Sequence, residues 1–505
     1  MEENKNMVFS SLEFVFAFLP IFLCIYYIVP KKIKNFTLLL GSFAFYVYGA
    51  VDYPTHIALL LASILVNFTL AKLSAPGKKA RKFFFVIDLL YNFLWLGLFK
   101  YSGFVSENIN QILTYFGKAP ITVPVLVLPL GISFYTFQIV SYVIDVYKGT
   151  IKEEDSIVSL GAYLCMFPQL IAGPIVTYSE VSAQMKDRTL SFNDFNEGLK
   201  DFTVGLGLKV LLANRIGNLW NDVNVIGYQS ISTPLAWMGI IAYTLQIYFD
   251  FYGYSLMAIG LGRMLGFKIP ENFDHPYVSL SMTEFWRRWH ITLGSWFREY
   301  VYIPLGGNRK GNSRTYFNLF VTWALTGIWH GAAWNFVLWG IFLFLVIAIE
   351  KAGLKKLLDK YKLIGHLYMI LLIPLSWLLF AVTDIKQIAM YFSRLFPFFG
   401  TGIYISEGDY IRHFSNYGIY MIIGLIFSTT LPKKIYLKIK DNASAVLFSL
   451  LFSGLPFTVC IWGLAIRSFI SDSNQENLSY EKYFKEILIL DHSSYNLRCN
   501  LSFPF

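Results

Sequence analysis

The sequence predicts an all-α polytopic membrane protein with about 11 to 13 transmembrane helices, given roughly 20 residues for each crossing. Of its 505 residues, 55% are hydrophobic and only 15% are charged, whereas ordinary soluble domains carry about 25% charged residues. The formal net charge of +10 could indicate nucleic-acid binding, but the basic residues form short clusters between apolar runs. Such clusters are typical of cytoplasmic loops, so we expect a multi-pass protein in contact with membrane lipid and no nucleic-acid partner.

The first part of the chain alternates apolar runs with basic and non-basic loops. The runs occupy residues 8–29, 36–50, 55–73, 83–99, 123–147 and 157–176. A lysine cluster at 31–34 follows the first run, the loop at 51–54 has no Lys or Arg, and residues 78–82 are basic again. This alternation predicts an extracytoplasmic N-terminus. No small-residue cleavage site follows the first run, so we expect it to remain as an anchor.

The C-terminal part continues the alternation. Residues 351–362 and 431–448 together hold nine lysines, whereas residues 384–414 between them hold three basic residues. The last 35 residues, 471–505, hold five acidic and three basic residues. The charge pattern therefore predicts a transmembrane domain over residues 1–470 and an extracytoplasmic C-terminal tail.

Charged residues interrupt the apolar pattern from about residue 192 to residue 300. They are Lys209, Arg215, Asp250 and Arg263. Backbone within hydrocarbon must satisfy its own hydrogen bonds, so broken helices persist only where they are buried in protein or line a cavity. We expect short, tilted or re-entrant helices here. Asp250 lies in Tyr-Phe-Asp-Phe-Tyr-Gly-Tyr (248–254); its neighbouring tyrosines could hydrogen-bond its carboxylate, and we favour a structural role for it.

His330 stands alone in a long uncharged segment. No Asp, Glu, Lys or Arg occurs among the 35 residues between Arg314 and Glu350, and these exceed one crossing, so they form a long tilted helix or a tight hairpin. A histidine there either hydrogen-bonds to a neighbouring helix or transfers protons, and the apolar setting favours the second interpretation. Gly327 and Gly331 would let another helix or a substrate approach closely. Four tryptophans lie around it as packing, interfacial anchors or cavity walls: Trp323, Trp329, Trp334 and Trp339.

Residues 281–300 form a second cluster and predict an amphipathic helix at the cytoplasmic face. Glu284 can pair with Arg287 or Arg288, which lie three and four residues later. His290 follows them among tryptophans. This histidine could bind an anionic ligand or fix the position of a helix.

Gly-Gly-Asn-Arg-Lys at 306–310 predicts a turn. Arg287, Arg288 and Arg309 could contact phosphate groups there, or they could simply mark a positive-inside loop. The four cysteines are widely separated, and no group of residues has metal-ligand spacing. We therefore expect no metal site.

Several motifs in these segments resemble the membrane-bound O-acyltransferase family, in particular its bacterial polysaccharide branch. They are Glu-Phe-Trp-Arg-Arg-Trp-His (284–290), Tyr-Ile-Pro-Leu-Gly-Gly-Asn-Arg (302–309) and Trp-His-Gly-Ala-Ala-Trp-Asn (329–335). Pro-Leu-Gly-Ile-Ser-Phe-Tyr-Thr-Phe-Gln (129–138) and Phe-Pro-Gln-Leu-Ile-Ala-Gly-Pro-Ile (167–175) are also similar. The resemblance extends to about residue 470.

The resemblance implies a bacterial cell-membrane O-acetyltransferase whose helices surround a central tunnel. His330 would be the catalytic histidine, and His290 a second characteristic histidine near the cytoplasmic entrance. Acetyl-CoA would be the donor, with its phosphates on Arg287, Arg288 or Arg309, and no cofactor would stay bound. The acetyl group would pass to an extracytoplasmic partner or carrier of the SGNH type and then to a cell-surface polysaccharide. As a neutral base, His330 would contribute about 10² to 10⁴ in rate.

The resemblance fails at the end of the chain, Asn-Leu-Ser-Phe-Pro-Phe, where similar bacterial members often carry a tyrosine-containing aromatic motif. Ser502 or Tyr495 could carry the acyl group, or the tail could dock a partner, which we favour. Three other functions remain open: D-alanyl transfer to teichoic acid by the same fold, an idle scaffold for export, and a proton-coupled transporter or flippase. A transporter would show repeated halves, and the sequence has none that we detect.

Overall fold

The protein is helical throughout the residues that the computed structural model describes. These residues are 7–123, 126–171, 173–396, 398 and 408–439. Within these ranges no β-strand occurs, and one isolated antiparallel bridge joins Phe273 to Trp289. The chain divides into a unit that ends at Ile435 and a C-terminal unit that begins at Tyr436. The predicted all-α fold class is confirmed.

The helices of the first part are α1 (Leu19–Ile28), α2 (Lys34–Gly49), α3 (Pro54–Ser74), α4 (Arg81–Tyr115), α5 (Ile132–Lys148), α6 (Ile157–Cys165), α7 (Phe167–Leu170), α8 (Tyr178–Lys186), α9 (Phe192–Gly207) and α10 (Asn214–Ile226). Those of the second part are α11 (Thr233–Met264), α12 (Met282–Arg288), α13 (Ile291–Phe297), α14 (Asn312–His330), α15 (Trp334–Ile349), α16 (Lys355–Lys360), α17 (Lys362–Ala381), α18 (Ile385–Leu395), α19 (Asp409–Phe427) and α20 (Leu431–Ile439). Short π-helical segments are η1 (Phe14–Phe18), η3 (Leu208–Ala213), η5 (Arg298–Tyr302) and η6 (Glu350–Leu354), and short 3₁₀ segments are η2 (Lys31–Ile33) and η4 (Pro276–Val278). The predicted tail at 471–505, with Tyr495 and Ser502, lies outside the described residues.

Four of the described helices are long and apolar enough to cross a membrane: α3, α4, α15 with its continuation to Lys360, and α17. The predicted number of 11 to 13 transmembrane helices came from counting apolar runs in the sequence. The structure divides several of these runs among shorter helices. The run at 157–176 becomes α6 and α7, which are separated at Met166, because Pro168 has no N–H to continue the first helix.

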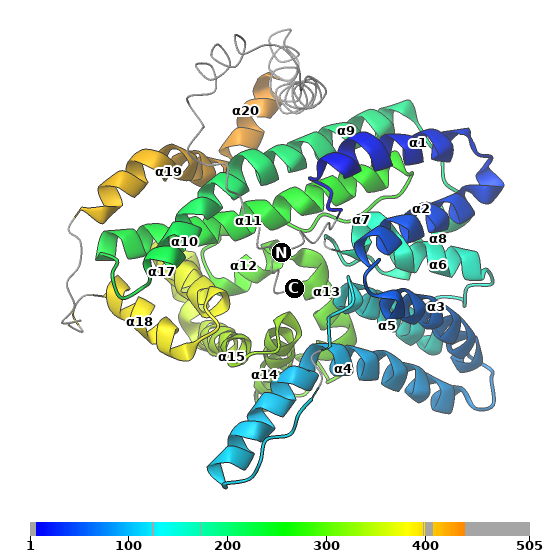
Figure 1. Ribbon diagram of the computed structural model, residues 1–505, viewed down its shortest axis with the longest axis horizontal. Helices are drawn as coiled ribbons and strands as arrows, with labels where there is room; N and C mark the ends of the chain where they lie inside the picture. Colours follow the sequence, from blue (N-terminus) through cyan, green and yellow to red (C-terminus); the bar gives the residue numbers. More distant parts are fainter. Residues whose placement is uncertain (1–6, 124–125, 172, 397, 399–407, 440–505) are drawn as a thin grey trace, which may run out of the picture. The chain divides into compact units, whose positions relative to one another are not determined.

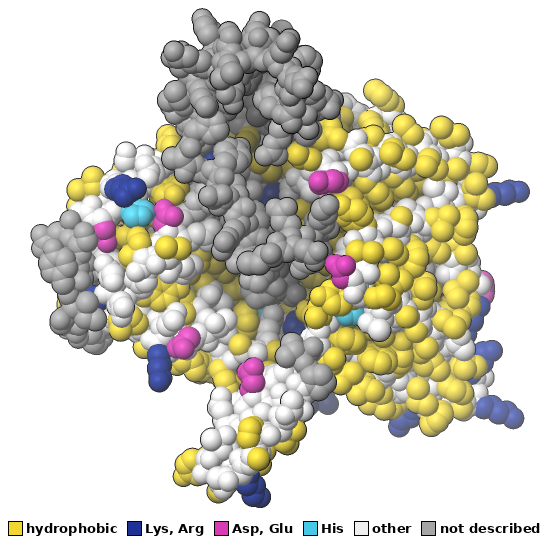
Figure 2. All heavy atoms as spheres, in the orientation of Figure 1, with side chains coloured by type: hydrophobic (Ala, Val, Ile, Leu, Met, Phe, Trp, Pro, Cys, Tyr) yellow, Lys and Arg dark blue, Asp and Glu magenta, His cyan; other side chains and the backbone are white. Residues whose placement is uncertain are grey.

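Large apolar side chains lie exposed on the helices near the N-terminus. Ile28 is 84% exposed, and Leu65 and Leu90 are more than half exposed. Figure 2 shows hydrophobic side chains gathered over the face where α1, α2 and α3 lie in Figure 1. Extended exposed apolar surface of this kind is typical of contact with lipid, and with the spanning helices it identifies a multi-pass membrane protein.

The long helix α11 is the main packing element of the region that the sequence predicted to be irregular. It packs along α9 and also against α10, α17, α18 and α19. An ion pair between Lys209 of η3 and Asp250 of α11 joins two side chains that are only 12% and 19% exposed. A lysine from the neighbouring segment therefore neutralises the Asp250 carboxylate directly, a partner that the local sequence did not suggest.

Candidate active site

The segment that carries His330 is a tight hairpin. His330 ends α14, and α15 begins at Trp334. A Cβ atom added to Gly327 would lie 2.4 Å from the Phe336 carbonyl oxygen, and one added to Gly331 would lie 2.1 Å from the Phe336 ring. Both predicted close approaches are confirmed, and the partner is α15 itself. Of the two alternatives for this segment, the hairpin is correct.

Aromatic side chains enclose the His330 ring. The ring is 6% exposed, and its centroid lies 4.8 Å from that of Trp329, 5.0 Å from that of Trp339 and 5.2 Å from that of Phe380 on α17. The two other predicted tryptophans do not contribute: Trp323 packs on Trp286, and Trp334 is half exposed. His330 therefore occupies an apolar enclosure built by α14, α15 and α17.

Lys100 approaches this enclosure from α4. Its ammonium donates to the carbonyl oxygen of Trp329 and to Ser133 Oγ, at 3.2 Å from the latter. The last carbonyls of a helix have no partner within the helix and carry partial negative charge, so a cation at the end of α14 stabilises the turn that presents His330. The sequence analysis missed Lys100, because a single lysine at the end of an apolar run is indistinguishable from a membrane-boundary anchor.

His290 lies at a break between two short helices, and the predicted continuous amphipathic helix over 281–300 is wrong. Its backbone is left-handed, with φ 44° and ψ 55°. The chain turns there because the bridge between Phe273 and Trp289 fixes the preceding residue and the Ile291 N–H donates to the Asn272 carbonyl oxygen at 3.0 Å. Tertiary hydrogen bonds thus override the local helical pattern.

Both histidines lie near one indole ring, that of Trp329. His290 is 2% exposed, and its ring meets Phe251 edge-on at 4.7 Å. The Trp329 centroid lies 6.5 Å from that of His290 and 4.8 Å from that of His330. The structure therefore brings together the two histidines that the sequence singled out 40 residues apart.

Asn272, which the sequence analysis did not single out, fixes the tautomer of His290. Its Oδ1 atom accepts from the backbone N–H of Thr292 at 3.2 Å and lies 3.1 Å from His290 Nδ1. A backbone N–H can only donate, so this side-chain atom must be the amide oxygen. The His290 nitrogen that faces the same oxygen must then carry a proton. In the neutral ring, Nε2 is left as a hydrogen-bond acceptor.

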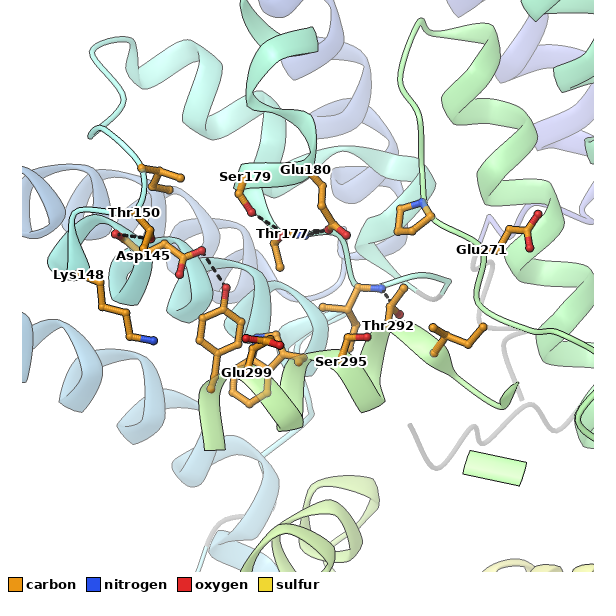
Figure 3. Close-up of a pocket in the computed structure, with 16 residues that line it drawn as sticks. Asp145, Lys148, Thr150, Thr177, Ser179, Glu180, Glu271, Thr292, Ser295 and Glu299 are labelled. Carbon is orange, nitrogen blue, oxygen red and sulfur yellow. Dashed lines mark hydrogen bonds between the residues drawn. The ribbon is translucent and has the colours of Figure 1, made fainter. Parts of the chain in front are cut away.

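A pocket of about 470 Å³ opens beside the His290 segment. Ile291, Thr292 and Trp296 form part of its wall, and Figure 3 shows Thr292 and Ser295 facing it from one side and Asp145 and Glu180 from others. Its charged lining residues are Asp145, Lys148, Glu180, Glu271 and Glu299.

The hydroxyl of Tyr300 donates to Asp145 Oδ2 at 2.8 Å at one end of this pocket. Burial raises the pKa of the Tyr300 hydroxyl, so Tyr300 stays a neutral hydrogen-bond donor at neutral pH. Carboxylates outnumber ammonium groups in the lining, so the pocket suits an uncharged, polar chain better than a phosphate group.

The arginines predicted to meet phosphate groups lie elsewhere. Arg288 pairs with Glu284 at 2.9 Å and with Asp274 at 3.4 Å, which confirms the predicted pairing within α12. Arg287 and Arg309 are exposed, and 306–310 forms the predicted turn. None of the three lines the pocket described above, and their contact with a donor stays a prediction. In the described ranges, no group of three or more potential metal ligands is found.

The chain is similar to known proteins over most of its length. Residues 151–393 match the membrane-bound O-acyltransferase family. The chain is 40% identical over 396 residues to a protein of Pseudomonas putida described as a probable alginate O-acetylase, covering 78% of this chain and 81% of that one. It is 34% identical over 419 residues to the peptidoglycan O-acetyltransferase of Helicobacter pylori, covering 75% and 78%. A teichoic acid D-alanyltransferase of Streptococcus thermophilus is 27% identical over 330 residues, covering 58% and 76%. The chain belongs to the membrane-bound O-acyltransferase family and is an acyltransferase.

Proposed function

We propose that this protein takes an acetyl group from acetyl-CoA on the cytoplasmic side of a bacterial cell membrane and passes it across for O-acetylation of a cell-surface or secreted polysaccharide. The relatives named as alginate O-acetylase and peptidoglycan O-acetyltransferase support acetyl as the group and a polysaccharide as the acceptor. Because the transferred group must leave the membrane, an extracytoplasmic partner of the SGNH type fits as its receiver.

His330 is the catalytic base in this proposal. As the acceptor oxygen bonds to the thioester carbonyl carbon, the hydroxyl proton moves to a ring nitrogen of His330. The tetrahedral intermediate then collapses, the carbon–sulfur bond breaks, and the proton passes to the departing thiolate. His290, whose Nε2 is held as an acceptor by Asn272, assists by orienting a donor group of the substrate. Only the small acetyl group has to cross the membrane, because moving the charged phosphates of CoA into hydrocarbon has a high free-energy cost.

The thioester approaches through the pocket beside Thr292. Lys148 lines this pocket. With Lys152 it follows the apolar run at 123–147, and the alternation of basic and non-basic loops predicts that this loop is cytoplasmic. The observation that carries the proposal is that two buried histidines lie near the same Trp329 ring, in a chain similar to acetyltransferases over most of its length.

The test is substitution of His330 by alanine in the full chain, in the bacterium that makes the polysaccharide. Acetate released by mild alkali from isolated polysaccharide should disappear in the His330→Ala strain. His366→Ala is the matched control, because His366 is an exposed histidine on α17, and it should acetylate normally. Acetate at the wild-type level in the His330→Ala strain, at equal protein in the membrane, would refute the proposal.

D-Alanyl transfer is the second candidate, because teichoic acid D-alanyltransferases are also similar to this chain. The two candidates differ in what the ester releases. Alkali should release acetate from the isolated polymer in the first case and alanine in the second. Recovery of esterified alanine, absent in the His330→Ala strain, would favour the second candidate.

A further inference from the structure

Two further aromatic rings lie between the pocket and the enclosure of His330. Trp296, which lines the pocket, stacks on Phe137 of α5 with centroids 3.9 Å apart and planes 2° apart. Phe137 in turn stacks on Trp329 at 5.2 Å and 19°, and Trp329 touches His330. The pocket therefore meets His330 through three rings in sequence. Rings spaced at 3.9 Å are in van der Waals contact, so no atom fits between Trp296 and Phe137.

These rings are held firmly in place. The indole N–H of Trp296 donates to the Phe137 carbonyl oxygen at 2.9 Å, which ties α13 to α5 at this point. The rings of Phe297 and Trp296 lie edge to face, and so do those of Phe297 and Phe137. Phe137 is 4% exposed and Trp296 is 5% exposed. Fixed apolar side chains therefore separate the pocket from the enclosure of His330.

We propose that Phe137, backed by Trp296, determines acyl-group specificity by restricting the space beside Trp329 to a two-carbon acyl group. This inference rests on the proposed function, because it takes the thioester to enter from the pocket. Each additional methylene in an apolar site of fixed size changes the rate by about 10- to 200-fold. The substitution Phe137→Ala removes the ring between Trp296 and Trp329. The volume of that ring then becomes available to a longer acyl chain.

The test compares acyl donors in membrane vesicles from the host that makes the polysaccharide. Radiolabelled acetyl-, propionyl- and butyryl-CoA are supplied, and alkali-labile label on the polysaccharide is counted. In Phe137→Ala the butyryl-to-acetyl ratio of initial rates should rise at least tenfold above wild type, and in the milder Phe137→Leu it should rise less. Phe134→Ala is the matched control: Phe134 lies on the same helix and also meets Trp329, at 5.9 Å, whereas the ring partners of Trp296 in the described part of the chain are Phe137, Phe297 and Tyr300.

The ratio in Phe134→Ala should stay at the wild-type value. An equal rise in both alanine variants would overturn the assignment to Phe137. An unchanged ratio in Phe137→Ala, or in Phe137→Leu if the alanine variant does not accumulate, would also overturn it. Because the ratio is internal to each membrane preparation, a mere loss of folded protein lowers both rates and leaves the ratio unmoved. If wild-type vesicles transfer no label from acetyl-CoA, or His330→Ala transfers it normally, the proposed function itself fails.

Discussion

Replacement of Gly327 by alanine should displace His330 without altering any group that takes part in the reaction. The added Cβ would lie 2.4 Å from the Phe336 carbonyl oxygen and 3.1 Å from the Gly340 Cα atom, about 1 Å short of ordinary contact with the oxygen. Because both neighbours are backbone atoms, α14 and α15 must separate by a similar amount. His330 lies three residues later, so it moves with the end of α14. A misplacement of about 1 Å costs about 10²-fold in rate, and overpacking of this kind typically costs about 1–3 kcal/mol in stability.

The assay is acetate released by alkali from the polysaccharide, normalised to the amount of protein in the membrane, together with thermal unfolding in detergent. The matched control is Gly103→Ala in α4, because no atom lies within 4 Å of a Cβ added to Gly103. This control should keep its activity, and its free energy of unfolding should rise by up to about 1 kcal/mol because alanine has a higher helix propensity than glycine. Wild-type acetylation in Gly327→Ala would show that the spacing of the hairpin does not set the position of His330.

Three further substitutions test the contacts that surround the site. Asn272→Leu removes the acceptor of three buried donors, which are the His290 ring N–H and the N–H and hydroxyl groups of Thr292. Loss of the acceptor for the two N–H groups alone should lower the free energy of unfolding by about 2–6 kcal/mol, and acetyl transfer should fall as well; wild-type values for both would contradict the tautomer assignment. Glu350→Gln should lower the free energy of unfolding by about 1.5–3 kcal/mol, because the carboxylate accepts from two backbone N–H groups at the start of α12. Thermal unfolding of the purified variant measures this change. Lys209→Met should lower the free energy of unfolding by about 3–5 kcal/mol, because it leaves Asp250 buried without its cation. The double variant Lys209→Met, Asp250→Leu should recover most of that stability; no recovery would mean that loss of the ion pair is not the cause.

The sequence was sufficient to predict the fold class and to single out two histidines that the structure buries near the same tryptophan, since both conclusions rest on local patterns. A long uncharged segment with one histidine and flanking glycines can be recognised from the sequence alone, and the close packing at Gly327 follows from residue size. The choice between a tilted helix and a hairpin could not be made, because it depends on how α15 packs back on α14.

The break at His290 and the partners of Asp250 could not be predicted for a different reason. The pattern around Glu284 and Arg288 is that of a helix, and only hydrogen bonds to Asn272, 18 residues away from His290, turn the chain there. A lone asparagine in a loop carries no signal in a single sequence. Likewise Lys209 and Asp250 are 41 residues apart, and the sequence offers no reason to pair them.

Glu350 links the helix that follows His330 to the short helix that precedes His290. It follows the last residue of α15. That helix has 16 residues, so Glu350 lies about 24 Å along it from the turn that holds His330. The Glu350 carboxylate accepts hydrogen bonds from the backbone N–H groups of Met282 and Thr283 in the first turn of α12. One rigid helix therefore joins the turn that presents His330 to the short helix that leads into His290. A displacement of α15 would therefore move the turn that holds His330 and the first turn of α12 together.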